Sequence, residues 1–392
     1  MFSLTFEPLV IVLLAVAAFG ALIALTYGLH AYRKAADFVN PPLPPEDALC
    51  PKATVLIYCQ SDEEVLTEML DALAQQDYPD YEAVVVCEAT PEYAEILNEK
   101  YSKLYTDVYV TFMLPGSHNV SRRKLAITIG VKAAKGEVIV NTVANVTIPS
   151  TTWLSSMMAP FCGESGKHKD VVLGLSRIDF TDMKGPGKWF RQFDSVLTNA
   201  LWVGYAASGH PYRGDGYNLA FRRETFFRHK GYARSINLHY GDDDIFINEI
   251  ATPSNTAVVV SDDSIIETNW GDSANRVWSI LKERYWFTSR WLPRAPFVQA
   301  SMMPAMAWLV LTASVGAALV ALPNLMAAVI GLVINLLLFW GEISCYRRLA
   351  SRFGAVRLWW GVVPFWLWRP VANAVFKYDH RHSSKKNFTW QR

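Results

Sequence analysis

The sequence predicts an α/β protein, in which a Rossmann-like, mostly parallel sheet forms one domain and is combined with transmembrane helices. Hydrophobic residues make up 51% of the 392 residues, and they are concentrated toward the two ends of the chain. Between the ends, runs of β-branched residues alternate with amphipathic stretches, the pattern of parallel strands covered by helices on both faces. We expect five segments, with boundaries at 1–34, 35–51, 52–298, 299–346 and 347–392.

The first element is a transmembrane helix. From Pro8 to Ala31 the only titratable side chains are His30 and Tyr27, and the run exceeds the roughly 20 residues that cross the hydrocarbon. A signal peptide is the competing interpretation. The apolar run is too long for one, no basic region precedes it, and it ends in Tyr-Arg-Lys instead of a small-residue cleavage site. We therefore expect residues 1–34 to contain a membrane helix.

A proline-rich link over Asn40–Pro45 follows, and its fixed φ angles predict a semi-rigid spacer before the folded domain. The domain then alternates strands and helices. Strands are expected at 53–59, 82–89, 108–114 and 137–143, and helices at 63–76 and 124–135. Ligands of parallel sheets bind beyond the carboxyl ends of the strands. The candidate site positions therefore come directly after Cys59, Val86 and Val140.

The chain becomes apolar again after Met302. Two stretches, 303–322 and 325–341, are joined by Pro323-Asn324 and predict a transmembrane hairpin. A last stretch, Leu358–Phe376, contains Arg369, two prolines and several tryptophans, and a basic tail follows it. A crossing would move that tail to the side that basic residues avoid, so an interfacial or re-entrant helix is favoured over a fourth crossing.

Charge and cysteine usage restrict the partners and the compartment. With 37 basic and 36 acidic residues the net charge is +1, so nothing indicates a nucleic-acid partner. Basic residues follow the membrane stretches at Arg33-Lys34 and again between Arg347 and Arg357, which predicts a cytosolic domain on a multi-pass membrane protein. A bacterial inner membrane is expected in preference to a eukaryotic Golgi membrane. Five cysteines without a CxxC pair predict packed, reduced thiols: Cys50, Cys59, Cys87, Cys162 and Cys345.

Six segments resemble, in order and spacing, the family 2 glycosyltransferases. They are PKATVLIYCQSDEE, QQDYPDYEAVVVCEAT, RRKLAITIGVKAAKGEVIVNTVANVTIP, GDGYNLAFRRETFFRHKGY, YGDDDIFINEI and LKERYWFTSRW. The resemblance implies a GT-A-like domain over 52–298 and a membrane-bound enzyme of the processive or ceramide-glucosyltransferase-like kind. Such an enzyme moves a sugar with inversion from a nucleotide-sugar donor to a lipid-linked or envelope glycan acceptor. Membrane lipids and subunits of an envelope complex are further implied partners.

The resemblance also implies a nucleotide-sugar site. Glu88, at a strand end, would accept an N–H of uracil or guanine, although an ordinary solvated glutamate remains the alternative. Lys124, beside Arg122 and Arg123, would offset the phosphate charge, although these residues also suit a solvated helix start. The implied donor-binding residues are Cys59, Ser61, Asp62, Glu88, Lys124, Asn145 and Arg284.

Three adjacent aspartates, Asp242, Asp243 and Asp244, are the strongest single feature. Carboxylates buried together repel one another and raise one pKa, a cost that a neutral surface turn has no reason to carry. Inverting transfer requires a general base for the acceptor hydroxyl. By resemblance the base is Asp243 or Asp244, with Asp244 preferred because Ile245-Phe246 fits the apolar continuation of the family motif.

The acceptor site is implied by the segment around Gly214–Asn218. Glycines allow close approach of a sugar, and an asparagine amide can both donate and accept hydrogen bonds. A plain turn before a helix at 221–228 is the structural alternative, as likely for Asp215 as a binding role. The implied acceptor residues are Gly214, Asp215, Gly216, Asn218, Tyr285 and Trp286.

Two motifs depart from the family. Val143-Ala144-Asn145 stands where the family has Asp-x-Asp, so Asn145 is the single remaining candidate ligand for Mg²⁺ or Mn²⁺. The Gln-x-x-Arg-Trp segment appears as Leu281 to Tyr285 and retains Arg284. Lysine and arginine could then neutralise the diphosphate without a metal, or with a metal carried by the substrate. The other interpretation is a catalytically inactive subunit or glycan-binding scaffold of a membrane complex.

Overall fold

The computed structural model describes residues 5–45, 48–60, 62–115, 120–185, 187–268 and 274–379. By internal contacts the chain forms two compact units. One unit, here called the membrane unit, comprises the described residues up to Phe38 together with 187–205 and 293–379. The other, the sheet unit, comprises the described residues of 39–185 and 206–292.

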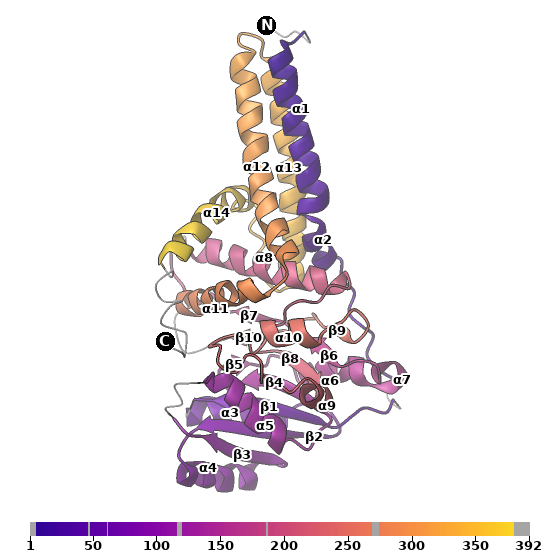
Figure 1. Cartoon of the computed structure of the whole chain (residues 1–392), viewed down its shortest axis with the longest axis vertical. Helices are drawn as coiled ribbons and strands as arrows, with labels where there is room; N and C mark the ends of the chain where they lie inside the picture. The colour runs from indigo at the N-terminus through magenta and orange to yellow at the C-terminus, as the bar shows by residue number, and fades with distance from the viewer. Residues whose placement is uncertain are drawn as a thin grey trace. The chain divides into compact units, whose positions relative to one another are not determined.

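The membrane unit contains three helical segments that are long and apolar enough to cross a membrane: Pro8–Gly28, Arg294–Val320 and Met326–Arg352. The first consists of α1 (Pro8–Ile23) and a π-helical turn (Ala24–Gly28), after which α2 (His30–Ala36) continues. The others are α12 (Arg294–Val320) and α13 (Met326–Arg352). α1, α12 and α13 run side by side (Figure 1). The predicted N-terminal helix and helical hairpin are therefore present.

Small residues set the close approach of these helices. A Cβ on Gly20 would lie 3.1 Å from Val310 Cγ2, and one on Gly331 would lie 3.0 Å from Ser314 Cβ. Next to that contact, the Asn335 Nδ2 donates to Ser314 Oγ at 2.9 Å. Because lipid tails are as apolar as leucine, helices in a membrane associate through such close packing and interhelical hydrogen bonds.

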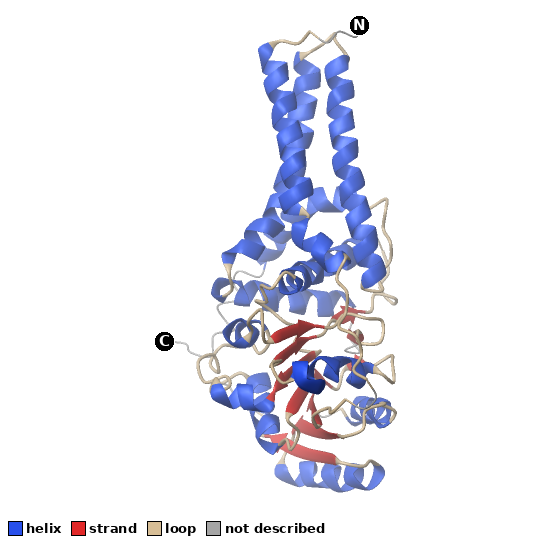
Figure 2. Cartoon of the chain, turned by 90° about the vertical axis from the view of Figure 1, so that its right-hand side faces the viewer, coloured by secondary structure: helices blue, strands red, loops and turns tan. Residues whose placement is uncertain are grey.

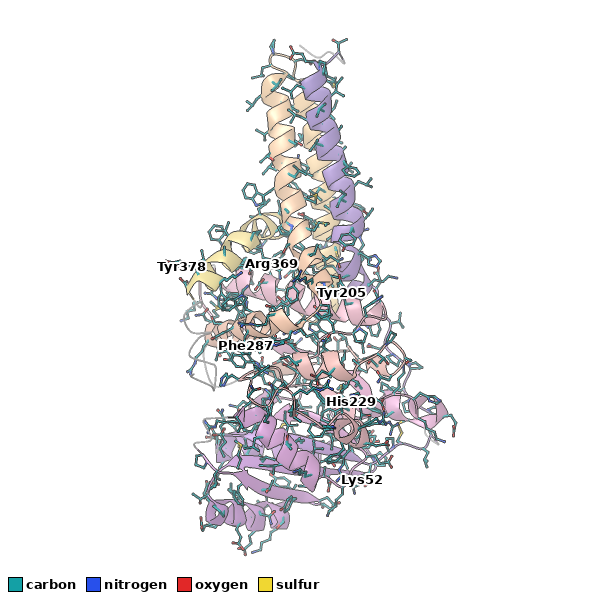
Figure 3. All side chains as sticks on the ribbon, in the orientation of Figure 1. Lys52, Tyr205, His229, Phe287, Arg369 and Tyr378 are labelled. Carbon is teal, nitrogen blue, oxygen red and sulfur yellow. A yellow bond between two sulfur atoms is a disulfide. The ribbon has the colours of Figure 1, made fainter. Side chains whose placement is uncertain are left out.

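Two further helices belong to this unit, α8 (Gly187–Ala207, assigned to it as far as Tyr205) and α14 (Val362–Asp379). Arg369 of α14 (labelled in Figure 3) donates from Nε to Asp194 Oδ1 of α8 at 2.8 Å. Both side chains are buried, so the charge that stands out in the sequence of the last apolar stretch is paired with an acid. α14 is not among the candidate spans, and its interfacial position remains a prediction.

The sheet unit contains a seven-stranded sheet in the order β3-β2-β1-β4-β8-β6-β9. β1, β2, β3 and β4 are parallel, β8 is antiparallel to both of its neighbours, and β6 pairs with β9 in parallel. The mostly parallel sheet that the sequence predicts is confirmed (Figure 2). The strands are Ala53–Cys59 (β1), Tyr81–Glu88 (β2), Val108–Met113 (β3), Val138–Val143 (β4), Val171–Leu173 (β6), Leu219–Arg222 (β8) and Thr256–Val258 (β9).

Helices cover the parallel strands on both faces. Val55 and Ile57 of β1 share one core with the apolar faces of α3 (Glu63–Ala74) and α4 (Pro91–Leu104). Leu56, which points to the opposite face, lies under α5 (Arg122–Ala133), where a Cβ on Gly130 would be 2.0 Å from its Cδ1. Strands buried on both faces explain why their sequences are almost continuously apolar.

The remaining elements are a second sheet and further helices. Leu219–Arg222 is strand β8, so the helix expected from Phe221 begins later, as α9. Strands β5, β10 and β7 form a second, three-stranded sheet. The bounds are Val146–Thr147 (β5), Ser176–Ile178 (β7), Ile266–Thr268 (β10), Trp153–Met158 (α6), Gly163–Gly166 (α7), Arg223–Arg228 (α9), Asp244–Ile250 (α10) and Ala274–Thr288 (α11). Short 3₁₀ turns occupy Ala159–Phe161 and Ser289–Trp291.

The expectation of five reduced thiols is wrong for two of them. Cys50 and Cys162 form a disulfide across 112 residues of sequence, whereas Cys59, Cys87 and Cys345 are buried free thiols. A pairing over that distance depends on tertiary proximity, which cysteine spacing does not reveal. Disulfides are rare in reducing cytosols outside hyperthermophiles. The bond therefore does not favour the cytosolic placement that the basic residues predict.

Cys50→Ser should lower the melting temperature of the full-length protein by several degrees, because the bond closes a long loop and removes entropy from the unfolded chain. Differential scanning fluorimetry with and without a phosphine reductant checks this. The reductant should destabilise the wild type and leave the Cys50→Ser variant unaffected. Equal melting temperatures of the untreated wild type and the variant would show that the bond does not form.

Candidate functional site

A cavity of about 350 Å³ opens at the carboxyl edge of the parallel strands, within the sheet unit. Gln60 follows β1, Glu88 ends β2 and Asn145 follows β4, and all three line it. Strand-end positions were expected to meet here, and they do. The described lining residues are Tyr58, Gln60, Glu88, Ser121, Arg122, Arg123, Val143, Asn145, Tyr217, His239, Tyr240, Asp242, Ile280 and Arg284.

Glu88 marks one end of the pocket. Its carboxylate forms an ion pair with the Arg122 guanidinium and accepts a hydrogen bond from the Tyr58 hydroxyl. The Glu88 side chain is only 9% exposed, whereas that of Arg122 is 44% exposed. The carboxylate accepts hydrogen bonds, and the adjacent guanidinium donates them. This combination suits the edge of a nucleobase, which carries both donors and acceptors.

The aspartates lie at the other end, on a tight turn before α10. Gly241 begins the turn with φ +97°, and a Cβ there would lie 2.5 Å from Ile245 Cδ1. Only glycine suits both demands. Asp243 caps α10, with its Oδ1 accepting from the Asp244 backbone N–H at 2.7 Å. The turn therefore directs the three carboxylates to different partners.

Asp242 is held between two arginines. Arg123 Nε lies 2.8 Å from Oδ2, and Arg284 Nη2 donates to Oδ1 at 2.9 Å. Burial alone would raise the pKa of Asp242, but the two guanidinium groups outweigh it and the pKa falls to about 2. Asp242 is therefore a fixed anion and a poor proton acceptor.

Asp244 is turned away from the pocket. Its Oδ1 lies 2.7 Å from Arg213 Nε, and its Oδ2 accepts from Thr288 Oγ1 at 2.6 Å. Burial raises the pKa of Asp244 to about 7, with neighbouring Asp243 adding to the rise and Arg213 opposing it. The crowded aspartates were expected to raise one pKa, and Asp244 carries that shift.

Asp243 is the most accessible of the three carboxylates. Its side chain is 12% exposed, against 2% for each of the others. The Oδ2 atom accepts only at longer range, from the Gly216 N–H and from Arg284 Nη2, both at 3.3 Å. This geometry favours Asp243 over Asp244, the aspartate that the sequence motif prefers, as the group an acceptor hydroxyl could reach.

Arg284, on α11 one turn before Phe287 (Figure 3), ties the aspartates to the pocket wall. Its Nη1 donates to the Tyr217 hydroxyl at 2.7 Å. The Arg123 guanidinium lies over the same tyrosine ring, 4.5 Å from its centroid. The described lining contains three arginines against two carboxylates. His239 adds no charge at neutral pH, because burial and then Arg284 lower its pKa. The described lining, which does not include Asp243, is thus net cationic by one charge, as a diphosphate requires.

The fold of the chain is similar to that of solved structures. A mannosyltransferase from Pyrobaculum calidifontis, in complex with GDP-Man and Mn²⁺, matches 92% of this chain and 99% of its own, with a TM-score of 0.52 and 18% identity. The fold is GT-A-like. S. aureus TarS 1–349 matches 85% of this chain and 92% of its own, alone and with UDP-GlcNAc, at TM-scores of 0.39 and identities of 14% and 13%. No protein-family model and no curated protein sequence matches the chain.

In this GT-A-like unit, several residues implied for donor binding lie outside the pocket. Lys124 is fully buried, and its ammonium binds backbone carbonyls instead of facing the cavity. Cys59 is buried in the core, because the last residue of β1 points into the apolar layer. Asp62 is exposed and caps α3, accepting from Val65 N–H at 3.2 Å. Ser61 lies outside the described residues.

The segment implied for acceptor binding serves mainly the fold. Asn218 is fully buried, donates to the carbonyls of Leu175 and Ser264 and accepts from Trp153 Nε1, so its amide is occupied. Asp215 accepts from Ser176 N–H and Oγ, and burial raises its pKa. For both residues the structural alternative describes the geometry better than sugar binding does.

The other acceptor positions lie nearer the aspartates. The Gly216 N–H faces Asp243, and a Cβ there would lie 3.1 Å from Oδ2 of both Asp242 and Asp243. Gly214 packs on Leu173 and Ile247 in the same way, which explains glycine at both positions. Tyr285 is half-buried, and the Arg213 guanidinium lies over the Tyr285 ring at 4.0 Å from the ring centroid. Trp286, the next residue of α11, is also half-buried.

The side chains of the pocket do not form a ligand set for a divalent cation. Asn145 lines the pocket but supplies one neutral amide oxygen. Among the described residues, no group of three or more histidine, cysteine, aspartate or glutamate side chains converges as a metal site. Each carboxylate of the aspartate turn is instead engaged by an arginine. Hard cations prefer several charged oxygens, so the departure from Asp-x-Asp is not repaired elsewhere in the described chain.

Sequence reasoning missed several residues that shape the site: Tyr58, Arg213, Tyr217, His239, Tyr240 and Thr288. Arg213 directly precedes the GDGYN segment, and Tyr217 lies inside it. The resemblance therefore indicated the correct segment but other side chains within it. Thr288 lies inside the LKERYWFTSRW segment and His239 directly precedes the YGDDDIFINEI segment, but a single hydroxyl or imidazole carries no spacing signal of its own.

Proposed function

We propose that the sheet unit is an inverting glycosyltransferase that moves a sugar from a nucleotide-sugar donor to an acceptor at the membrane. One observation carries the proposal. Asp243, the most exposed aspartate of the turn, lies beside Arg284, and the adjacent Asp242 pairs with both Arg123 and Arg284 at the carboxyl edge of a mostly parallel sheet. Such a site can take a proton from a nucleophile and bind the phosphates that leave on the other side.

The donor would lie along the pocket with its base at Glu88 and Arg122 and its diphosphate at Arg123 and Arg284. The guanidinium groups are already fixed by Asp242 and Tyr217, so no reorganisation is needed when charge develops on the leaving group. GDP-Man and UDP-GlcNAc, which are present in the similar structures, represent the nucleotide-sugar classes to test first.

In the transfer step, the Asp243 carboxylate would accept the proton of an acceptor hydroxyl as its oxygen bonds to the anomeric carbon. The bond between that carbon and the diphosphate oxygen breaks, and the nucleoside diphosphate leaves with the electron pair. Attack opposite the leaving group inverts the anomeric centre. Three candidate membrane spans favour a lipid-linked or envelope glycan as acceptor.

A second function, a catalytically inactive subunit or glycan-binding scaffold of an envelope complex, has one observation in its favour. All three carboxylates of the turn already have cationic partners. An inactive protein would bind no nucleotide sugar, and its melting temperature would not change at concentrations far above a typical dissociation constant.

The deciding experiment is a thermal-shift and product-release screen of the detergent-solubilised full-length protein against GDP- and UDP-sugars. The glycosyltransferase proposal expects one donor to raise the melting temperature and to release its nucleoside diphosphate when membrane lipids are added. Neither stabilisation nor release by any donor would favour the scaffold.

Chelation provides a separate prediction. Because arginines occupy the place of a metal cradle, transfer should keep most of its rate in 5 mM EDTA (about a hundredfold above trace metal), as expected if cationic side chains supply the charge stabilisation. The measurement compares initial rates with EDTA and with added Mn²⁺. Complete loss in EDTA and full recovery with Mn²⁺ would show that the donor brings an essential metal.

We further propose that α14 lies in the membrane interface. Its exposed apolar residues follow helical spacing along one face: Trp368, Val371, Val375 and Tyr378, with exposures of 53%, 41%, 53% and 67% (Tyr378 is labelled in Figure 3). Trp366, Arg369 and Phe376 are buried on another face. Aromatic and apolar side chains on one face, with a basic residue opposite, are typical of helices in the headgroup region.

A nitroxide attached at Val375→Cys in nanodiscs should be reached by oxygen in the bilayer, whereas one at Lys377→Cys, on the opposite side of the helix, should be reached by a water-soluble relaxation agent. Both native positions are exposed and neighbouring, so they form a matched pair. Equal access of the aqueous agent to both labels would place α14 in water.

A further inference from the structure

The first turn of α5 is bound to the backbone of a distant segment, Ser235–Tyr240, which leads into the aspartate turn. Ser121 donates its N–H to the Ile236 carbonyl at 2.8 Å and its Oγ to the His239 carbonyl at 3.0 Å. The Lys124 ammonium donates to the carbonyls of Ser235, Leu238 and Tyr240 at 2.6, 3.2 and 2.9 Å. Five carbonyls of six consecutive residues are thus held by one helical turn.

The Lys124 side chain has no exposed surface, and its three ammonium protons meet three carbonyls. A buried charge is costly unless all its donors are satisfied. The buried charge does not serve ligand binding directly, because Lys124 is not among the described residues that line the pocket. The charge serves the segment, which forms turns instead of a helix or strand and in which the Ser235 carbonyl also accepts from the Leu238 N–H at 3.0 Å.

The same turn holds both ends of the pocket. Arg122 pairs with Glu88 at the end where the base is proposed to bind. Arg123 pairs with Asp242 and donates to the Gly216 carbonyl at the aspartate end. The segment that Lys124 binds supplies His239 and Tyr240 to the pocket wall, directly before the aspartate turn.

We propose that Lys124 is a positioning residue of this site: its buried ammonium fixes segment 235–240, so that His239, Tyr240 and Asp242 take their places in the pocket. It acts through the backbone and touches neither donor nor acceptor. The structural part of this inference stands without the proposed glycosyl transfer, and only its effect on rate rests on that function.

The hold of Lys124 on the segment should depend on pH, because deprotonation removes one of its three N–H donors. Burial lowers the pKa of Lys124 to about 8. The charged groups that act on it are Asp242, Asp243, Glu249 and Arg284. His239, neutral at this pH, is a further titratable neighbour, and the Tyr232 ring lies 5.9 Å from the ammonium. Below the folded pKa the ammonium serves three carbonyls, and above it the amine can serve only two.

The contribution of Lys124 to global stability changes with pH in the opposite direction. The folded pKa is below the ordinary lysine value, so between pH 8 and about 10.4 the unfolded chain binds the extra proton and this group's contribution to stability rises with pH. Loss of activity above pH 8 would therefore come from local release of the segment and not from unfolding.

Hydrogen–deuterium exchange of the detergent-solubilised full-length protein at pH 7 tests the inference without any substrate. Lys124→Met should raise the exchange rate of peptides covering 235–241 at least tenfold and leave those of β1 and β2 unchanged. Lys132→Met, an exposed lysine at the other end of the same helix, is the matched control and should leave 235–241 as in the wild type.

Ser121→Ala removes one hydrogen bond to the segment and should give a smaller increase confined to 235–241, which keeps the test decisive if Lys124→Met does not fold. Unchanged exchange of 235–241 in Lys124→Met, or in Ser121→Ala when Lys124→Met is unfolded, would overturn the proposal. Once a donor is known, the wild-type rate should fall above about pH 8 and the Lys124→Arg rate should not. A fall that persists in Lys124→Arg would contradict the role of the ammonium.

Discussion

Asp243→Asn should lower the rate of sugar transfer by about 10²–10⁴-fold, the usual contribution of a positioned general base. Asparagine keeps the Oδ1 that accepts from the Asp244 N–H, so the cap of α10 survives the change. Removing one negative charge beside Arg284 should leave nucleoside-diphosphate affinity unchanged or slightly higher. Initial rates and isothermal titration with the nucleoside diphosphate measure the two effects separately.

Asp244→Asn is the informative comparison. It leaves Arg213 buried without its carboxylate partner, so we expect a clear fall in melting temperature together with any loss of rate. Asp262→Asn, on an exposed turn, should change neither quantity. A stable Asp243→Asn variant with wild-type rate would remove Asp243 from the base role and return it to Asp244.

Arg284→Met should lower kcat/KM by about 10²–10³-fold, the effect of losing one preorganised charge-stabilising group. It should also weaken nucleoside-diphosphate binding, because Arg284 lines the pocket and is the cation shared by Asp242 and Asp243. Arg284→Lys should restore little, since one ammonium cannot reach both carboxylates and the Tyr217 hydroxyl as the planar guanidinium does.

Loss of fold must be separated from loss of chemistry, because removing one partner of a buried ion pair is strongly destabilising. The double variant Arg284→Met with Asp242→Asn removes one charge of each sign. It should recover much of the melting temperature and none of the transfer rate. Arg276→Ala, on the exposed first turn of α11, is the surface control. Wild-type nucleotide affinity in a folded Arg284→Met protein would contradict the proposed diphosphate site.

These variants test a site in which arginines and aspartates hold one another in place. Arg123 and Arg284 enclose Asp242, Arg213 holds Asp244, and Asp243 is left partly accessible between them. Each cation lowers the cost of burying its carboxylate, and together they leave the pocket positive. The same cluster can thus be structural and still present one base and a phosphate-binding wall.

Much of this architecture was readable in the sequence. The strands Ala53–Cys59 and Val138–Val143 were predicted closely, because residues buried on both faces of a parallel sheet must be apolar without interruption. The helices that are long and apolar enough to cross a membrane could be predicted for a similar reason, since hydrocarbon tolerates few charges over a span of fixed length. The strand ends located the pocket, and the aspartate run indicated the place of a shifted pKa.

The tertiary structure decided which side chains face that pocket. Lys124 and Asn218 have the residue types expected of ligand-binding groups, yet the fold buries both and uses them on backbone carbonyls. The Cys50–Cys162 bond and the pairing of Arg213 with Asp244 join residues that no motif connects. Periodicity and composition report the average surroundings of a segment. The partner of one polar atom depends on where distant segments meet, and that is fixed only when the chain has folded.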